Sequence, residues 1–164
     1  MDSIYAYLAG AIDADGFFTI QVSRPSPSRI DGRRTVYYTP KVGFSEIHPI
    51  IPDLLHQTFG GWRGMHTPKN PAHRPWHIWQ ATNALAADVA RHLLPHLRLK
   101  RRQAELIIEL QERITSYRPK GRSVSEEEAT ERHRLYVALT QLNKPRNRRV
   151  HFDTSTIPPL PSGI

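Results

Sequence analysis

Two aspartates that flank a single alanine, Asp13 and Asp15, are the residues whose types and spacing point most directly to chemistry. They come just before Gly16, a residue that commonly ends helices. Carboxylates at a helix C-terminus face the negative end of the helix dipole, which costs about 0.3–1 kcal/mol each. In an arbitrary Asp-x-Asp-Gly stretch they would be solvated turn residues. If two such helices packed side by side, however, their carboxylates would converge, and bound cations would make that arrangement tolerable.

The stretch that precedes these aspartates predicts a helix, capped by Asp2 or Ser3, with two different faces. Bulky apolar side chains recur every four residues on one face: Ile4, Leu8 and Ile12. Small residues recur at the same interval on a face about 200° away: Ala6, Gly10 and Ala14. A stripe of small residues lets another backbone approach closely. We therefore expect this small face, with Asp13, to form an interface with a second copy of the chain.

Residues 8–16, LAGAIDADG, resemble the signature of the LAGLIDADG homing endonucleases at eight of nine positions, with Ala11 in place of Leu. The motif occurs once, as in the single-motif branch of the family, whose members work as homodimers. The resemblance implies that Asp15 binds the catalytic divalent metal and that the backbone carbonyl of Ala14 assists. It gives Asp13 a capping, structural role. The implied cofactor is Mg²⁺ or Mn²⁺, and Ca²⁺ is expected to bind without supporting cleavage.

The resemblance also implies two further catalytic residues. Residues 94–106, LPHLRLKRRQAEL, resemble the region in which a helix junction interrupted by proline presents a lysine to the active site, and Lys100 takes that position. The alternative for Lys100 is a solvated cluster that steers phosphates. Glu46 takes the place of a polar residue, commonly Gln, that organises water around the metal, and an acid there could act as a base or an outer ligand. His48 stands close to another basic position of the family.

Composition supports a polyanionic partner. The chain has 164 residues, of which 38% are hydrophobic, enough for one domain with a core. Its formal net charge is +8 and its pI is about 10.2, which favours nucleic acid or an anionic membrane surface. No basic amphipathic helix with a clean apolar face stands out, so we expect nucleic acid and no membrane partner, and the resemblance implies that the nucleic acid is double-stranded DNA. The lack of cysteines, of long apolar stretches and of a signal peptide predicts an intracellular protein.

The histidines do not predict a zinc site. His92 and His96 are four residues apart, but Pro95 lies between them and would spoil the helical spacing that a pair of ligands needs. The sequence contains no His-Glu-x-x-His or Cys-His pattern.

Periodicity predicts an α+β fold with the order α-ββ-α-ββ-α and extra C-terminal helices. The expected elements follow a helix that ends near residue 16: strands 17–24 and 35–46, a helix ending at 60–61, strands 62–67 and 74–82, and helices 84–94, 97–117 and 125–142. Ser125 and Glu128 have the spacing of a capping box. We expect one domain over residues 1–143 and a basic, proline-rich tail over residues 144–164.

The four strands should form a curved antiparallel sheet with helices on one face and a ligand on the other. A two-stranded ribbon fits the major groove of DNA, and alternate polar side chains can reach base edges there. The predicted DNA-binding residues are Thr19, Gln21, Ser23, Arg24, Thr35, Tyr37, Thr39, Lys41, Arg63, His66, His77 and Arg101. We expect core packing, rather than base stacking, for Trp62, Trp76 and Trp79.

These observations and the resemblance together predict a sequence-specific DNA endonuclease of the homing type. It would hydrolyse phosphodiester bonds in a long pseudo-palindromic site and leave short 3′ overhangs, as part of the homing of an intron or intein. The alternatives are a maturase that binds intron RNA and a DNA-binding regulator that does not cleave. The presence of Asp15 and Lys100 argues against the regulator.

Overall fold

The computed structural model of the chain describes residues 2–23, 36–70, 72–117 and 124–144. Its elements are α1 (Asp2–Asp15), β1 (Phe17–Ser23), β2 (Tyr37–Glu46), α2 (Ile50–Phe59), β3 (Trp62–His66), β4 (Trp76–Thr82), α3 (Asn83–Leu93), α4 (Arg101–Ser116) and α5 (Glu126–Asn143). This confirms the predicted order and the α+β class. The proposed tail falls outside the described residues except for Lys144, so the boundary at residue 143 stays a prediction.

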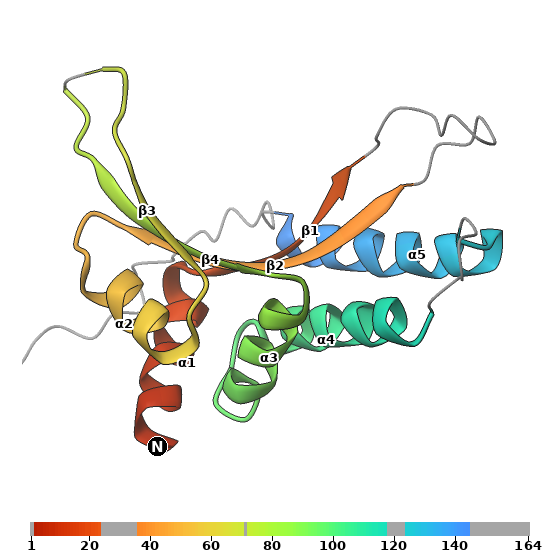
Figure 1. Cartoon of the computed structure of the whole chain (residues 1–164). Coiled ribbons are helices and arrows are strands. Elements are labelled where there is room, and N and C mark those ends of the chain that lie inside the picture. The colour runs from red at the N-terminus through yellow and green to blue at the C-terminus, as the bar shows by residue number, and fades with distance from the viewer. Residues whose placement is uncertain (1, 24–35, 71, 118–123, 145–164) are drawn as a thin grey trace, which may run out of the picture.

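The four strands form one open antiparallel sheet in the order β1-β2-β4-β3. Each hairpin therefore contributes one central and one edge strand, and the two hairpins join where β2 pairs with β4, from Lys41 opposite Thr82 to Glu46 opposite His77. The hairpins rise at opposite ends of the sheet, whereas the helices lie on the other side (Figure 1). The result is the predicted saddle, with one concave face left uncovered.

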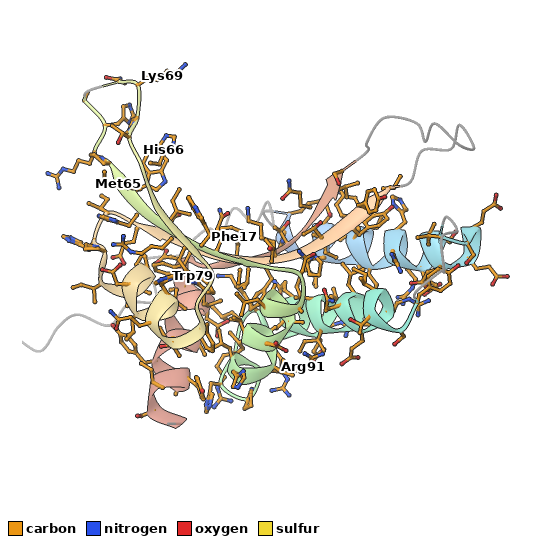
Figure 2. The ribbon with its side chains drawn as sticks, in the orientation of Figure 1. Phe17, Met65, His66, Lys69, Trp79 and Arg91 are labelled. Carbon is orange, nitrogen blue, oxygen red and sulfur yellow. The ribbon has the colours of Figure 1, made fainter. Side chains whose placement is uncertain are left out.

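Alternation along the strands decides which side chains are buried. Phe18, Ile20, Val42, Phe44 and Trp79 are almost fully buried on the face that the helices cover. Their neighbours in the chain point to the concave face, because successive residues of a strand alternate between the two sides of a sheet. Phe17 is one of these neighbours: its ring lies over Gly43, its register partner in β2 (Figure 2).

The core fills the space between the covered face and the helices. Helices α1, α3, α4 and α5 contribute these fully buried side chains: Leu8, Ile12, Val89, Leu93, Leu106, Ile107, Leu110, Leu135 and Leu139. Trp79 also donates a hydrogen bond of 2.7 Å from Nε1 to the carbonyl oxygen of Gly60, just past the end of α2. The prediction of core packing is thus confirmed for Trp79. It is wrong for Trp62, which is 56% exposed, and Trp76 is only half-buried on the concave face.

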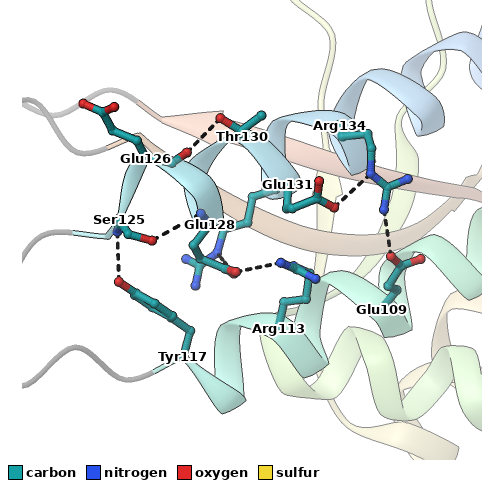
Figure 3. Close-up of polar contacts among 10 residues, drawn as sticks. Glu109, Arg113, Tyr117, Ser125, Glu126, Glu128, Thr130, Glu131 and Arg134 are labelled. Atoms are coloured by element: carbon teal, nitrogen blue, oxygen red, sulfur yellow. Dashed lines mark hydrogen bonds and ion pairs between the residues drawn. The ribbon is translucent and has the colours of Figure 1, made fainter.

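Helices α4 and α5 are joined by a charged network (Figure 3). The buried Glu128 carboxylate accepts hydrogen bonds of 2.8 Å from Arg113 and from Arg132. The predicted capping box is half formed: Ser125 Oγ accepts from the Glu128 amide at 3.3 Å, but the Ser125 amide donates to the Tyr117 hydroxyl instead of to Glu128. Glu128 is used to fasten α5 to α4, which the helix-start pattern did not reveal.

Helix α4 begins at Arg101 rather than near residue 97, because residues 98–100 form a junction whose backbone amides bind a side chain of α1. In the described part of the chain no helix is both long and apolar enough to span a bilayer.

Replacing Trp79 with Phe should lower the free energy of unfolding by about 1–3 kcal/mol. The change keeps a buried aromatic ring but leaves the Gly60 carbonyl without its partner. Chemical denaturation at fixed protein concentration measures the effect. Trp62→Phe is the matched control on the exposed face and should change the free energy by less than about 0.5 kcal/mol. Equal losses in both variants would contradict the assignment of faces.

Candidate active site

The Asp13 side chain is turned away from its own helix toward the start of α4. Its Oδ2 accepts hydrogen bonds from the backbone amides of Arg98 at 2.6 Å and Leu99 at 3.1 Å, and its Oδ1 accepts from the amide of Lys100 at 2.9 Å. The side chain of Lys100, the N-cap residue of α4, makes no capping hydrogen bond. A carboxylate is favoured at a helix N-terminus by the free amides and the dipole. Asp13 therefore caps α4, which agrees with its predicted structural role.

Lys100 makes the reciprocal contacts. Its Nζ donates to the last carbonyls of α1, at 2.8 Å to Ile12, 2.6 Å to Asp13 and 3.3 Å to Ala14. A cation is favoured at a helix C-terminus for the same electrostatic reason. Partial burial lowers the pKa of Lys100 below its ordinary value, and the negative charges of Asp13 and Asp15 oppose that shift. The structure thus brings Lys100 to the end of the helix that carries Asp15, and its catalytic role stays a prediction.

Asp15 is the acid that remains available at this end of α1. Asp15 is exposed and is the last residue of α1, and Gly16 alone separates it from Phe17, the first residue of β1. Gly16 makes this short connection possible: a Cβ at Gly16 would lie 2.7 Å from Ile12 Cδ1 and 2.8 Å from Ile12 Cα. The chain therefore leaves the helix at once and enters the sheet, with the Asp15 carboxylate beside the Lys100 ammonium and facing solvent.

The Ala14 carbonyl, the backbone group that the resemblance assigns to the metal, accepts a contact from the Lys100 ammonium at 3.3 Å. In the described part of the chain no three His, Cys, Asp or Glu side chains cluster in a way that could hold a metal ion. Asp15 and the Ala14 carbonyl would therefore supply only part of a coordination sphere, and their metal-binding role remains a prediction.

Glu46 lies at the end of β2, half-buried and on the same face as Val42 and Phe44, as its parity predicted. It pairs across the sheet with His77, whose Nδ1 is buried and has no hydrogen-bond partner among the described residues. His48 is exposed, two residues after the strand. Lys100 lies at the end of α1 with Asp15, and Glu46 lies at the end of β2. The catalytic roles of the three residues remain predictions.

The concave face holds most of the predicted DNA-binding residues. The strand register places these on it: Thr19, Gln21, Ser23, Tyr37, Thr39, Lys41 and His66. Ser45, Gln80 and Thr82 lie on the same face and were not predicted. These three residues alternate along β2 and β4 with the buried residues Phe44, Trp79 and Ala81. That alternation is the sequence pattern from which their place on the concave face could have been predicted.

Two predicted DNA-binding residues, Arg63 and His77, lie on the opposite face of the sheet. Arg63 pairs in register with the buried Trp79, so its side chain lies on the helix side, where it forms an ion pair with Asp53 of α2. His77 shares the face of Trp79 and Ala81 because residues two apart on a strand point the same way. The remaining candidate among the described residues is Arg101 at the start of α4, where it donates to the Leu94 carbonyl at 3.3 Å and pairs with Glu105 at 3.5 Å. The predictions for Arg24 and Thr35 lie outside the described residues.

The small face of α1 is uncovered within one subunit. Ala6, Gly10 and Ala14 are exposed, and no atom lies within 4 Å of a Cβ built on Gly10. The bulky face is buried at Leu8 and Ile12. Asp13, also predicted at the interface, is only 9% exposed, and its carboxylate accepts hydrogen bonds from backbone amides of its own chain.

His92 makes contacts within the helical layer. Its Nδ1 contacts the carbonyl oxygen of Asp88 at 2.8 Å, and its ring packs against Tyr5 and Phe59.

Comparison with known proteins identifies the fold. No protein-family model matches the sequence, and no curated protein matches it. Among solved structures, the chain is similar to the homing endonuclease I-CvuI in complex with its target, at 18% identity over 91% of this chain and 87% of that one, with a TM-score of 0.65. The archaeal intron-encoded homing endonuclease I-Vdi141I, complexed with DNA, gives 15% identity, coverage of 90% and 89%, and a TM-score of 0.68. The chain is also similar to the LAGLIDADG homing endonuclease I-GzeII in complex with its DNA target, at 13% identity over 82% of this chain and 43% of that one, with a TM-score of 0.55.

Replacing Asp13 with Asn should destabilise the protein by about 2–3 kcal/mol, because three amide hydrogen bonds lose their charged acceptor. Chemical denaturation without divalent metal measures the loss. Asp15→Asn is the matched control two residues away: its carboxylate is exposed, so its free energy of unfolding should change by less than about 0.5 kcal/mol. The reverse order of effects would refute the capping role of Asp13.

Proposed function

Because the chain has the fold of the LAGLIDADG homing endonucleases, we propose that it is a homodimeric, divalent-metal-dependent endonuclease that cuts double-stranded DNA at a specific site. The observation that carries this proposal is the meeting of Asp15 and Lys100 at the end of α1, where the motif helix enters a concave sheet face rich in polar side chains. The contacts of Lys100 with the α1 carbonyls give this lysine a structural role. Within the described part of the chain, the exposed Asp15 has no comparable role in the packing of the fold.

Asp15 and the Ala14 carbonyl would hold the metal. Oxygen ligands of this kind suit Mg²⁺ or Mn²⁺, and Ca²⁺ would bind without supporting cleavage. When bound, the ion would lower the pKa of an attacking water and stabilise the leaving oxygen of the phosphodiester. The remaining ligands would be the scissile phosphate, water and the second subunit, since one subunit offers no complete cluster within its described residues.

Lys100 would stabilise the negative charge that develops on the phosphate, as a positioned cation does at a reacting phosphoryl group. Its position is well determined, because its backbone amide is held by Asp13 and its ammonium by the α1 carbonyls. Glu46, at the end of β2, would accept a proton or order a water at the same site. His77 lies opposite Glu46 in the adjacent strand β4, and its Nδ1 has no hydrogen-bond partner among the described residues.

The dimer would form through the small face of α1. No atom of the described chain lies within 4 Å of a Cβ built on Gly10, so packing within one subunit does not require a glycine there. A glycine in a helix interior lowers helix stability. Close approach of a second helix would account for its presence. The likeness to I-GzeII is consistent with this: 82% of this chain corresponds to 43% of that chain, which has room for a second such unit.

The concave face would lie on the duplex, with β-strand side chains in the major groove. Two copies related by a two-fold axis would read a long pseudo-palindromic site and cut across the minor groove to leave short 3′ overhangs. Such a specific cut in DNA would serve the homing of an intron or intein.

Replacing Gly10 with Leu should convert the dimer into monomers. The side chain would meet open space in one subunit and would separate the two helices in the dimer. Light scattering coupled to size exclusion measures the mass, and circular dichroism checks that the subunit remains folded. Gly10→Ala is a graded control and should weaken association less. A wild-type chain that is monomeric on its full-length target would contradict the proposal.

Replacing Asp15 with Asn should abolish cleavage of the target in Mg²⁺ while binding of the target is kept. The change preserves shape but removes one carboxylate charge from each half of the site, on which affinity for a divalent ion depends. Plasmid cleavage with Mg²⁺ and then EDTA tests the activity, and gel shift measures binding. Asp88→Asn, an exposed acid on α3, is the matched control and should cut normally. A cutting Asp15→Asn dimer would place the chemistry elsewhere.

A further inference from the structure

The two hairpins present different chemistry to the concave face. Hairpin β1–β2 carries hydrogen-bonding side chains there, among them Thr19, Gln21, Thr39 and Lys41. Hairpin β3–β4 carries a row of mostly apolar rings and one aliphatic chain, which we call the aromatic ridge: Trp62, His66, Trp76 and Ile78. The register aligns this row, since Trp62 lies opposite Gln80, Gly64 opposite Ile78, and His66 opposite Trp76.

The rings of the ridge lie close to the sheet. A Cβ added to Gly64 would come within 2.4 Å of the Trp62 ring, so this indole lies over the glycine, yet Trp62 remains 56% exposed. The rings of His66 and Trp76 are stacked, with centroids 4.1 Å apart and planes 29° from parallel. Figure 2 shows His66 on the rising β3–β4 hairpin. Gly64 therefore lets the hairpin present a low apolar surface next to its backbone.

An exposed apolar surface of this kind favours contact with an apolar partner, because removing the rings from water lowers the free energy. The major groove of DNA offers one apolar group, the C5 methyl of thymine, and apolar side chains are the ones that contact it. The ridge is continuous with the polar strands on one concave face, which favours a duplex spanning both hairpins over a ligand that binds the ridge alone.

We propose that the aromatic ridge reads thymine methyl groups in the major groove, and that each half of the target carries thymine where it crosses β3–β4. Hairpin β1–β2 reads its own segment by hydrogen bonds. This inference rests on the proposed function, and it adds the base identity that one hairpin selects and the chemical group by which it does so.

Selection of bound duplexes from a randomised library with the full chain in Ca²⁺ is the first step. Sites recovered should contain thymine at one or more symmetric positions. Each such thymine is then replaced by deoxyuridine, which keeps the base pair and removes only the methyl group. Affinity should fall about fourfold for each methyl that the ridge contacts, the factor expected for burial of one such group.

Trp62→Ala tests whether the ridge makes this contact. The ratio of affinities for the thymine and deoxyuridine duplexes should fall toward one in this variant. Met65→Ala is the matched control, because Met65 is also exposed, at 60%, and lies on the same strand but points away from the concave face. It should keep the full ratio. Thermal unfolding of both variants shows that each subunit is folded.

The outcomes separate this inference from the proposed function. Specific binding that is indifferent to deoxyuridine at every position, or a ratio that survives in Trp62→Ala, overturns the inference and leaves the endonuclease standing. Failure to select any duplex overturns the proposed function itself. If Trp62→Ala weakens binding of single-stranded oligouridine RNA more than binding of duplex DNA, the ridge is a stacking platform for RNA and the proposed methyl readout is wrong.

Discussion

The exchange of charged groups between two helix ends is the interaction on which this structure depends. The C-terminus of α1 has carbonyls without partners and the N-terminus of α4 has amides without partners. Asp13 leaves the first helix to bind the amides of the second, and Lys100 leaves the second to bind the carbonyls of the first. Each helix end is thereby satisfied by the other, and neither side chain can move without freeing backbone groups of the partner helix. The end of α1 is thus fixed by contacts within the chain itself.

This exchange explains why two aspartates in one motif behave differently. The Asp13 carboxylate is bound to the start of α4, so Asp15, two residues nearer the sheet, is the acid whose side chain remains exposed. Gly16 then turns the chain directly into β1, because any side chain there would strike Ile12. The short connection places Asp15 beside Phe17, the first residue on the concave face. The proposed catalytic acid and the first residue of the proposed DNA-binding face are thus only two positions apart in the chain.

The sequence could predict what local patterns determine. Alternation identified the strands, and the motif located α1, Asp15 and the small face at Gly10. It could not show what Asp13 binds, since those amides lie 85 to 87 residues away in the chain. Arg63 was misplaced for a related reason: β3 is short and has exposed residues on both faces, so only its register with β4 reveals that Arg63 lies opposite the buried Trp79.

The positive charge of the chain and its reading surface are largely separate. Among the paired strand residues whose register places them on the concave face, Lys41 is the one lysine or arginine, although the chain as a whole carries a formal charge of +8. Two exposed cations, Lys69 and Arg74, lie instead in the segment that joins β3 to β4. Figure 2 shows Lys69 at the tip of this hairpin, at the rim of the saddle. Contacts to phosphates set affinity and position without reading sequence, whereas contacts to base edges specify it. On the proposed function, a concave face with few charges bordered by cations would divide the two tasks: the rim would attract and orient any duplex, and the polar and apolar side chains of the strands would discriminate among the duplexes bound.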